Sequence, residues 1–489
     1  MSKPNNPIKF FNTLTRREED FAEVTGKKPG DTVLMYNCGP TVYSNAHIGN
    51  LSAYIMADLI RRFLEYKGYK VIQAKNITDV GHLVSDSDTG EDKMEVSARK
   101  EKKSPLEIAR FYEGLYLADE RKLHLREPEF RPRATETIEE MITIITDLVK
   151  KGFAYETSDG VYFDLEKYPD YGKLSGNTLE SIRAGARIDI DENKKNSADF
   201  ALWKKLVGEN KNHILKWPSP WGEGFPGWHI ECSAMAEKHL GKIIDIHTGG
   251  EDNIFPHHEC EIAQTRCKTG EKLFSHFWMH KRHIQVEGEK MSKSKGNFYT
   301  LQDLEDKGIN PLDFRLLILM AHYRSRTNFT FNGLNSAKEF RLKFINTMLV
   351  LQMMNFDEIL DKERDNQELE YIVNTEIKID EALSADLNTP EMIAEMNKLF
   401  DHLDKVTKSG LSKTSAKRYQ ELLKQLDEIL AVLPESFDIA EKVTEMLEKR
   451  KEARINKDFK ASDEIRDEIS REGYVVLDTA KGQVLNLKD

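Results

Sequence analysis

Residues 32–74 read TVLMYNCGPTVYSNAHIGNLSAYIMADLIRRFLEYKGYKVIQA, and this stretch decides the fold. Its first part, Thr32–Tyr36, is a short apolar run with a β-branched residue, which indicates a buried strand. After a Cys-Gly-Pro turn, apolar residues recur at helical spacing from Leu51 to Tyr66, and Gly68 ends the helix. Residues 69–74 predict a second strand. Strand, helix and strand form a βαβ unit, so we expect an α/β fold with a parallel sheet.

The tetrapeptide His47-Ile48-Gly49-Asn50 stands directly before that helix. A helix N-terminus favours anions because its first N–H groups are free, and a glycine lets a ligand approach the backbone closely. The imidazole of His47 can then donate to a phosphate oxygen. The same position is also typical of a histidine that only caps the helix, and the tetrapeptide alone fits both interpretations.

A second stretch, residues 281–300, reads KRHIQVEGEKMSKSKGNFYT. Its middle, Lys290-Met291-Ser292-Lys293-Ser294, lies between Gly288 and Gly296, so this loop can bend and close over an anion. Lysines are point charges that suit phosphate, and serine hydroxyls add neutral donors. A solvated basic loop is the alternative interpretation, and the upstream tetrapeptide shifts the balance towards phosphate binding.

Composition narrows the protein class. The chain has 489 residues, of which 39% are hydrophobic and 32% are charged, which is ordinary for a soluble protein of several domains. We find no apolar run long enough for a membrane span or a signal peptide, so we expect a cytoplasmic protein with no membrane partner. Its four cysteines are too few for a disulfide framework. The net charge of −11 argues against nucleic-acid binding by bulk charge but allows a local basic face.

The two motifs together resemble the signature pair of class I aminoacyl-tRNA synthetases. Four further stretches are similar to cysteinyl-tRNA synthetase: Cys38–Tyr43, Gly227–Met235, Phe255–Gln264 and Lys457–Asp467. These motifs are independent of one another and occur in the order that the family has. Their positions extend the resemblance over nearly the whole chain. One position departs from the family pattern, since Asn50 stands where a second histidine is commonest; asparagine keeps a donor but cannot be cationic.

The resemblance implies a three-part organisation. A Rossmann-like catalytic domain would occupy residues 1–330, with an insertion at about 125–215 and the signature-loop region at about 275–330. A helical bundle that binds tRNA would follow at 331–438, and Met392, Ile393, Met396, Leu399, Phe400 and Leu403 form an apolar stripe typical of its core. A C-terminal anticodon-binding region would occupy 439–489 and end in a hairpin over Tyr474–Leu487.

The implied activity is that of a cysteine–tRNA ligase, which activates L-cysteine with ATP and transfers it to the 3′-terminal ribose of tRNA-Cys. We expect the enzyme to be a monomer. Its reaction needs no covalent enzyme intermediate, because positioning of the substrates and stabilisation of charge suffice. His47, Asn50, Lys290 and Lys293 would be catalytic: the first two would hold phosphates, and the lysines would neutralise the departing pyrophosphate. Mg²⁺ would arrive with ATP.

Family positions also imply the binding residues. ATP would contact Thr41, His47, Gly49, Asn50, Gly249, Gly250, Asp252 and Lys293, the glycines by close backbone approach and the aspartate through ribose hydroxyls. The substrate cysteine would contact Gly39, Thr41, Thr78, Trp228 and His247. For Thr78, Trp228 and His247, the respective alternatives are a strand threonine, a core aromatic residue and a histidine at a strand end.

The resemblance also implies one Zn²⁺. His257 and Glu261 are four residues apart and share one helix face, a spacing that is also typical of a surface ion pair. In the family, the residues matching Cys38, Cys232, His257 and Glu261 hold the ion in the amino-acid pocket. Cys260 and Cys267 match no family ligand and are interpreted as ordinary helix residues, although Cys260 is close enough to His257 to be an outside candidate. Shape alone separates near-isosteres such as serine and cysteine by about 1–3 kcal/mol, whereas zinc strongly prefers a thiolate.

Two rival functions stay open at this point. One is a paralogue that joins cysteine to an amino sugar, but such proteins lack the full tRNA-binding tail. The other is a helical nucleic-acid-binding protein with a structural zinc and no catalysis. In the tail, Lys449, Arg450, Lys451 and Arg454 form a basic patch suited to phosphates. The family's tail usually carries a tryptophan near its end, and residues 482–489 contain none.

Overall fold

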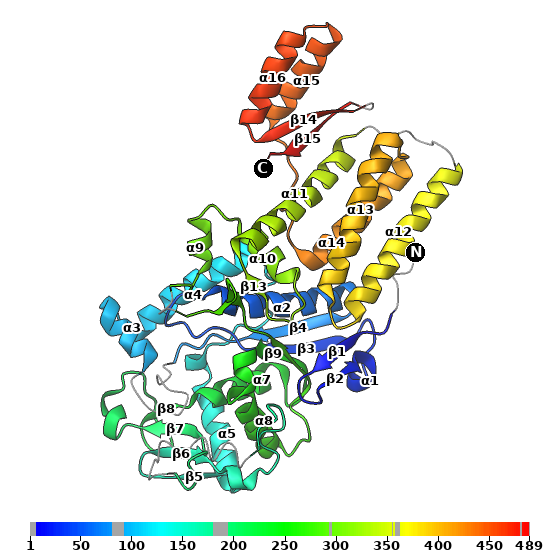
Figure 1. Ribbon diagram of the computed structural model, residues 1–489. Helices are drawn as coiled ribbons and strands as arrows, with labels where there is room; N and C mark the ends of the chain where they lie inside the picture. The colour runs from blue at the N-terminus through cyan, green and yellow to red at the C-terminus, as the bar shows by residue number, and fades with distance from the viewer. Residues whose placement is uncertain are drawn as a thin grey trace. The chain divides into compact units, whose positions relative to one another are not determined.

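The computed structural model describes residues 6–80, 92–178, 194–292, 296–354, 356, 362–479 and 482–488. The chain divides into two units (Figure 1). The first, here called the catalytic unit, comprises Pro7–Gly308 and Tyr323–Thr327, and the second, the helical unit, comprises Met1–Asn6, Ile309–His322 and Asn328–Asp489.

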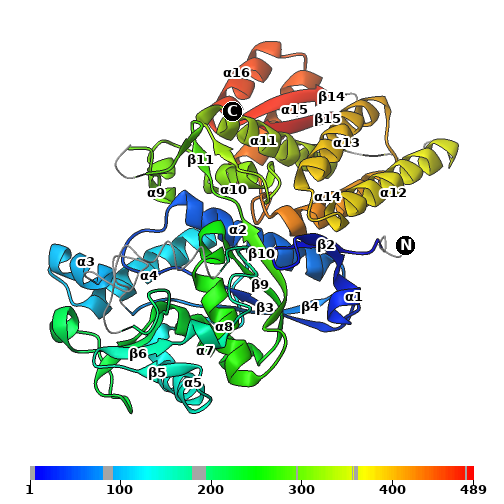
Figure 2. The same ribbon diagram turned by 60° about the horizontal axis from the view of Figure 1, so that its bottom comes forward.

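A four-stranded parallel sheet forms the centre of the catalytic unit. Its order is β10-β9-β3-β4, with bounds β3 Thr32–Asn37, β4 Lys70–Lys75, β9 Ile244–Gly250 and β10 Ser275–Lys281 (Figure 2). The helix α2, Ile48–Tyr66, connects β3 to β4. The βαβ unit and the parallel sheet predicted from residues 32–74 are therefore confirmed.

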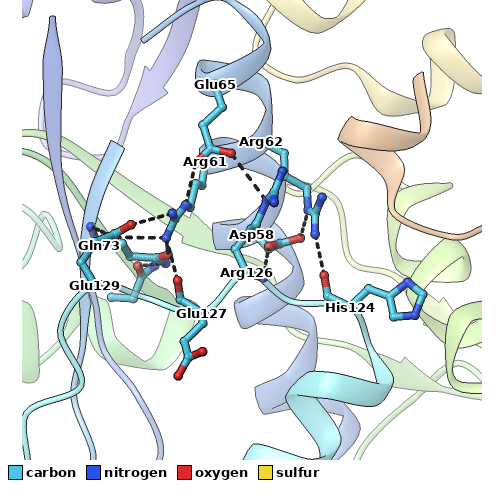
Figure 3. A network of polar contacts seen from close by, with 10 residues as sticks. Asp58, Arg61, Arg62, Glu65, Gln73, His124, Arg126, Glu127 and Glu129 are labelled. Atoms are coloured by element: carbon cyan, nitrogen blue, oxygen red, sulfur yellow. Dashed lines mark hydrogen bonds and ion pairs between the residues drawn. The ribbon is translucent and has the colours of Figure 1, made fainter. Parts of the chain in front are cut away.

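The helix α2 is buried on its apolar face and also carries three buried charged side chains, Asp58, Arg61 and Arg62. Arg62 Nε donates to Asp58 Oδ2 at 2.6 Å, and Asp58 Oδ1 accepts from the backbone N–H of Arg126 at 2.7 Å (Figure 3). Arg61 binds both carboxylate oxygens of Glu129 at 2.8 and 3.2 Å. This network ties the chain segment 124–129 to α2.

The segment that follows, residues 130–134, runs beside β4 as an irregular edge. Phe130 N–H donates to the carbonyl of Gln73 at 3.1 Å, and Ile77 N–H donates to the carbonyl of Pro132 at 2.8 Å. The helices α3, Lys93–Glu101, and α4, Pro105–Lys122, precede this segment. These two hydrogen bonds hold the segment that follows α4 against the edge of the parallel sheet.

The insertion carries a second, antiparallel sheet of order β5-β6-β7-β8. Its strands are β5 Ala154–Glu156, β6 Gly160–Phe163, β7 Ala201–Lys205 and β8 Gly224–Pro226, and β5 and β6 form an antiparallel hairpin. The sheet continues to Pro226, beyond the expected end of the insertion near residue 215, because β8 pairs with β7. The helices α5 Ile138–Lys150, α7 Trp228–Leu240 and α8 His257–Thr269 share one apolar core with both sheets.

The remaining elements of the catalytic unit are short. Near its N-terminus lie β1 Lys9–Asn12, β2 Arg17–Asp20 and α1 Phe21–Thr25. After β10 come β11 Gln285–Val286 and β12 Glu289–Lys290, which pair antiparallel, and α9 Leu301–Glu305. Short 3₁₀ helices occur at Ala134–Glu136, Leu165–Lys167, Gly208–Asn212 and Glu251–Ile254.

The helical unit contains the predicted bundle and tail. Its elements are α10 Pro311–Leu319, β13 Asn328–Phe329, α11 Phe331–Met353, α12 Lys362–Ser384, α13 Thr389–Ser409, α14 Lys413–Leu430, α15 Glu441–Ile455, α16 Phe459–Arg471, β14 Tyr474–Thr479 and β15 Gly482–Leu487. The predicted apolar stripe of α13 is buried, from Met392 to Leu403. The predicted C-terminal hairpin is β14 and β15. Among the described residues, every helix is too short or too polar to cross a membrane.

Arg450, one of the four residues of the predicted basic patch, is not exposed like its neighbours. Arg450 is fully buried, and its guanidinium binds both carboxylate oxygens of Asp478 on β14 at 2.7 and 3.0 Å. The expectation that Arg450 contacts phosphate is therefore wrong, because this cation joins α15 to the hairpin. Lys449 and Lys451 are exposed, and Arg454 is partly paired with Asp478 at 3.3 Å.

Candidate active site and metal centre

Two cavities lie where the parallel strands end, which is where open α/β sheets bind ligands. The larger, of about 320 Å³, is lined by the loop after β3, one face of α4 and the first turns of α7 and α8. The smaller, of about 240 Å³, is lined by the start of α2, the turn after β9 and parts of residues 281–291. Cys38, Gly39, His47, Asn50 and Tyr54 line both cavities, so the two cavities share a wall.

Four predicted metal ligands meet at the wall of the larger cavity, which Cys38, Cys232 and His257 line. Cys38 follows β3, Cys232 lies on α7, and His257 and Glu261 lie on α8. One ligand atom from each lies within 4.8 Å of all the others. The Sγ atoms of Cys38 and Cys232 are 3.9 Å apart, and His257 Nε2 lies 2.9 Å from Glu261 Oε1. The structure therefore contains a candidate metal site with two sulfur, one nitrogen and one oxygen ligand.

The electrostatics of this cluster favour a cation. Burial raises the pKa of the Cys38 thiol. Burial opposes ionisation of Cys232 as well, but its hydrogen bond with Cys38 and the charge of His257 lower its pKa to about 6. Burial also opposes ionisation of Glu261, yet His247 and His257 lower its pKa to about 2. A buried set of thiolate, imidazole and carboxylate ligands fits a tetrahedral divalent cation such as Zn²⁺.

A second set of ligand atoms overlaps the first. Cys38, His247, His258 and Glu261 also lie within 4.8 Å of one another. His247 and His258 are buried and do not line either cavity, whereas Cys232 and His257 line the larger one. His258 Nδ1 is 2.8 Å from His280 Nε2, and its Nε2 is 3.3 Å from Cys38 Sγ. Only the set with Cys232 and His257 can therefore present a cation to a ligand in the cavity.

His47 caps α2 and lines both cavities. The backbone N–H of Asn50 donates to His47 Nδ1 at 3.2 Å, and the backbone N–H of His47 donates to Asn50 Oδ1 at 3.2 Å. Because Nδ1 accepts this bond, the proton of the neutral ring is on Nε2, where it can be donated. The capping and ligand-binding interpretations of His47 are therefore compatible.

Gly49 is required by close packing at the same helix end. A Cβ atom at this position would lie 2.8 Å from the His47 ring and 3.1 Å from Met291 Cε. Lys290 and Met291 line the smaller cavity, and the Asn297 side chain holds this loop by accepting from Ser292 N–H and donating to the Lys290 carbonyl. Lys293 lies outside the described residues.

Of the three ATP-binding residues predicted at or just after the end of β9, Gly250 and Asp252 line a cavity and Gly249 does not. Gly250 and Asp252 line the smaller cavity. Asp252 binds His283 Nε2 at 2.9 Å, and that hydrogen bond lowers the pKa of Asp252. Gly249 does not line either cavity, and a Cβ atom there would lie 2.8 Å from His258 Cε1. The structure thus places Gly249 against the histidine cluster.

Four of the five predicted cysteine-binding residues, Gly39, Thr41, Thr78 and Trp228, line the larger cavity. Gly39 is needed there because a Cβ atom would lie 1.8 Å from the carbonyl oxygen of Asn76. The fifth residue, His247, is instead buried behind the cavity, with Nε2 at 2.7 Å from Glu261 Oε2. His247 therefore orients a candidate metal ligand.

Comparison with known proteins decides the family. The model of the tRNA synthetases class I (C) catalytic domain matches residues 25–339, that of the DALR domain matches 378–434, and that of the cysteinyl-tRNA ligase anticodon binding domain matches 437–484. A cysteine–tRNA ligase of Caldicellulosiruptor saccharolyticus is 43% identical over 97% of this chain and 98% of its own. The chain belongs to the cysteine–tRNA ligases. A ligase of Chlorobaculum tepidum is 40% identical over 98% and 99% of the two chains.

Solved structures support the fold of this ligase. Methionyl-tRNA synthetase of Mycobacterium tuberculosis, in complex with methionyl-adenylate, matches with a TM-score of 0.56 at 14% identity and covers 82% of this chain and 90% of its own. LeuRS of Agrobacterium radiobacter K84, in a ternary complex, matches with a TM-score of 0.60 at 12% identity and covers 83% and 84%. The predicted fold class is thereby confirmed. The two rival functions are wrong, because the chain contains both the catalytic and the anticodon-binding domain.

Sequence reasoning missed several residues in the site of this ligase. His258 and His280 contact the cluster from behind, and the adjacent histidines at 257 and 258 were the available signal. Tyr112 and Tyr116 of α4 line the larger cavity, although nothing in the sequence connects α4 with β3 or α7. Only the folded chain brings these elements together.

Proposed function

We propose that this ligase activates L-cysteine with ATP and transfers it to the 3′-terminal ribose of tRNA-Cys, with Zn²⁺ selecting the cysteine thiolate. The observation that carries the proposal is the buried Cys/His/Glu cluster, three of whose ligands line a cavity that shares a wall with a second cavity. An amino acid with a sulfur atom at one end and a carboxylate at the other fits such an arrangement.

The larger cavity supplies the cysteine site. When bound by Cys38, Cys232, His257 and Glu261, Zn²⁺ would supply a coordination position that takes a thiolate in strong preference to a hydroxyl. Trp228, which lines this cavity, stacks on His257 with ring centroids 4.7 Å apart. Thr78 donates to Glu231 at 3.0 Å, which orients its side chain at the cavity wall.

The smaller cavity supplies the ATP site. His47 Nε2 and the N-terminus of α2 would bind phosphate oxygens, and Gly49 and Gly250 would let the nucleotide approach the backbone. Asp252 would accept from ribose hydroxyls. Thr41 and Gly249 were also predicted to contact ATP, but their positions support indirect roles: Thr41 lines only the larger cavity, and Gly249 packs against His258.

The shared wall positions the two reactants. The cysteine carboxylate would attack the α-phosphate, forming a C–O–P linkage as the bond to pyrophosphate breaks. Lys290 and Lys293 would neutralise the charge that develops on pyrophosphate, and Mg²⁺ would enter with ATP. The ribose hydroxyl of tRNA would then attack the carbonyl carbon, and AMP would leave. The protein's share is positioning and charge stabilisation.

The tail supplies a surface for the anticodon end of tRNA. Ile455 ends α15 and Phe459 begins α16, and these side chains are 71% and 62% exposed, which is unusual for large apolar side chains. Lys457 and Lys460 lie beside them, and Lys449 and Lys451 are on α15. Exposed aromatic and basic side chains together are typical of surfaces that stack unpaired bases and contact phosphates. The monomeric state and the cytoplasmic location stay predictions.

An exchange assay tests this function. Labelled pyrophosphate should enter ATP only when cysteine is present, without any tRNA, and serine should not substitute for cysteine. Addition of tRNA-Cys should then give cysteinyl-tRNA. Equal exchange with serine and cysteine would contradict the role of the metal cluster, and cysteine-dependent exchange without aminoacylation would contradict the role of tRNA.

A further inference from the structure

Tyr54 lies on α2 about one helical turn after Asn50. Residues that are four apart share one face of a helix, and both of these side chains line the larger and the smaller cavity. In the sequence, Tyr54 is only one member of the apolar helical repeat of α2. In the structure it stands at the wall where, by the proposed function, cysteine and ATP meet.

The Tyr54 hydroxyl makes no hydrogen bond to another described residue, although the side chain is only 5% exposed. Buried tyrosine hydroxyls usually have a partner. Two tyrosines of α4 that line the larger cavity follow this rule, since Tyr112 donates to Glu101 and Tyr116 donates to Glu120, each at 2.5 Å. Packing alone would be satisfied by a phenylalanine, so the hydroxyl of Tyr54 indicates a ligand in the cavity.

A buried network beside Tyr54 holds its ring in place. The ring lies edge-on to Tyr116, with centroids 5.4 Å apart, and Lys75 Nζ lies 5.3 Å from its centroid. The Glu120 carboxylate binds both neighbours, because Lys75 Nζ and the Tyr116 hydroxyl each donate to it at 2.5 Å. Arg131 binds the other oxygen of Glu120 at 2.8 Å. A ring fixed in this way presents its hydroxyl with little further loss of side-chain freedom on binding.

The hydroxyl is protonated near neutral pH. Burial and the charge of Glu120 raise the pKa of Tyr54 above its usual value of about 10. A neutral phenol can donate to a phosphate oxygen, but it neither carries a charge of its own nor removes a proton from a reactant. Tyr54 is therefore equipped to donate a hydrogen bond at the shared wall.

The neighbours of Tyr54 at this wall indicate which group it faces. Cys38 belongs to the metal cluster, where the cysteine thiolate would bind, and His47 stands at the N-terminus of α2, where phosphates would bind. The part of the reactants that lies between these two sites is the carboxylate with the α-phosphoryl group. The carboxylate loses negative charge as it attacks, whereas the non-bridging oxygens of the α-phosphoryl group keep theirs.

We propose that the Tyr54 hydroxyl donates a hydrogen bond to a non-bridging oxygen of the α-phosphoryl group while cysteine is activated. The proposal rests on the proposed function, because the two reactants must meet at the shared wall. A carboxylate oxygen of cysteine forms a bond to the α-phosphorus, and the bond from that phosphorus to pyrophosphate breaks, with its electron pair leaving on pyrophosphate. Tyr54 keeps its proton throughout. A donor fixed at the reacting group lowers the barrier to this step.

The first test removes one oxygen atom. Tyr54→Phe keeps the ring, and Tyr66→Phe is the control, a buried tyrosine further along α2 that does not line either cavity. In single-turnover reactions at saturating cysteine and ATP, Tyr54→Phe should form cysteinyl-adenylate about tenfold or more slowly, with an unchanged KM for cysteine and the same thermal unfolding midpoint as the control. Tyr66→Phe should react as the unaltered chain does. An unchanged rate in Tyr54→Phe, or an equal fall in both variants, would overturn the proposal.

The second test locates the lost contact with three ligands. Cysteinyl-sulfamoyl adenosine is a stable analogue of the adenylate in which a sulfamoyl group replaces the α-phosphoryl group, cysteamine lacks the carboxylate, and adenosine lacks the phosphates. Tyr54→Phe should bind the analogue about fivefold or more weakly and should bind cysteamine and adenosine as the unaltered chain does. Unchanged affinity for the analogue would overturn the proposal. Equal weakening of cysteamine or adenosine would also overturn it, because Tyr54 would then only shape a pocket.

These outcomes are distinguishable from failure of the proposed function. If the unaltered chain shows no cysteine-dependent pyrophosphate exchange and no aminoacylation, the function itself is wrong. If it shows both, and Tyr54→Phe forms the adenylate as fast as the unaltered chain, only the role of Tyr54 is wrong.

Discussion

A substitution at Cys232 tests whether the buried cluster is a metal centre or only a group of buried polar residues. Its sulfur faces Cys38 and His257 and lines the cavity, so Cys232→Ser changes one ligand atom with little change in volume. Because zinc prefers thiolate to hydroxyl, we expect this variant to lose most of its metal. Metal analysis of the purified protein checks this. Cys267→Ser is the control, since Cys267 is buried on the same helix as His257 but belongs to neither ligand set, and it should keep one equivalent.

Resemblance to a family, rather than residue spacing, defined part of the site. His257 and Glu261 were assigned from a resemblance, and the structure brings them to Cys38 and Cys232. The sequence could not reveal that His247 lies behind the cavity. The alternation of side chains along a strand gives the face of the sheet on which a side chain lies but not its distance from a ligand. The neighbouring Gly249 is a similar case: a glycine after a strand is typical of a nucleotide site, and the sequence does not reveal that this position also makes room for the His258 ring.

Among the elements, α2 combines a functional N-terminus with a buried ionic anchor (Figure 3). Asp58→Ala removes the carboxylate that the buried Arg62 guanidinium binds at 2.6 Å. Breaking such a pair costs about 3–5 kcal/mol, so we expect a clear fall in the thermal unfolding midpoint. Arg126→Ala is the matched control, because it keeps the backbone N–H that Asp58 accepts and removes a side chain that is 47% exposed and pairs with Glu65 at 3.6 Å, a surface contact of about 0–1 kcal/mol. A fall as large in the control would contradict the role of the buried pair.

The N-terminus of α3 depends on a titratable pair. Burial opposes protonation of His213, but the hydrogen bond to Asp92, at 2.7 Å, and the charges of Asp92 and Glu95 raise its pKa above the usual value. A folded-state pKa that is raised contributes stability below the unfolded value of about 6.5 and loses it as pH rises through the folded pKa. Asp92 also caps α3.

We therefore expect α3 to open more readily at high pH. Hydrogen exchange of its backbone amides, corrected for intrinsic rates, should show weaker protection at about pH 9 than at about pH 6. His213→Gln should abolish most of this difference. Protection of α3 in the unaltered chain that does not change with pH would contradict the role of the pair.

Over the whole molecule, the sequence was most informative in segments where apolar residues recur with a single period, either helical or that of a strand. The βαβ unit, the α13 stripe and the C-terminal hairpin follow from local patterns, and the structure has all three. Long-range pairing was not predictable. Arg450 looked like its exposed neighbours Lys449 and Lys451, and only its contact with Asp478, 28 residues later, reveals a structural cation. The tail thus has its own small core of Val443, Leu447, Ile469, Val476 and Leu485.

Separate cores allow the two steps of the reaction to be separated. Removal of residues 441–489 should leave cysteine-dependent exchange nearly intact, because every assigned catalytic, nucleotide and metal residue lies before residue 294. Aminoacylation should fall sharply, and the salt dependence of tRNA binding should become shallower, since phosphate contacts of Lys449, Lys451 and Arg454 would be lost. β15 packs on α11 through a bond from Leu487 N–H to Asn346, so the truncated protein must first be shown to be folded by its exchange activity.

Point variants of the full chain avoid that uncertainty. Phe459→Ala should weaken tRNA-Cys binding by about five- to tenfold or more through lost base stacking, without a change in the salt slope, because no charge is removed. Lys449→Gln/Lys451→Gln should lower the slope itself by about 2. The double variant Glu464→Gln/Glu468→Gln on α16 is the control for altered charge, and it should not weaken binding. If both test variants aminoacylate tRNA-Cys as the unaltered chain does at every salt concentration, the tail is structural and the anticodon is bound elsewhere.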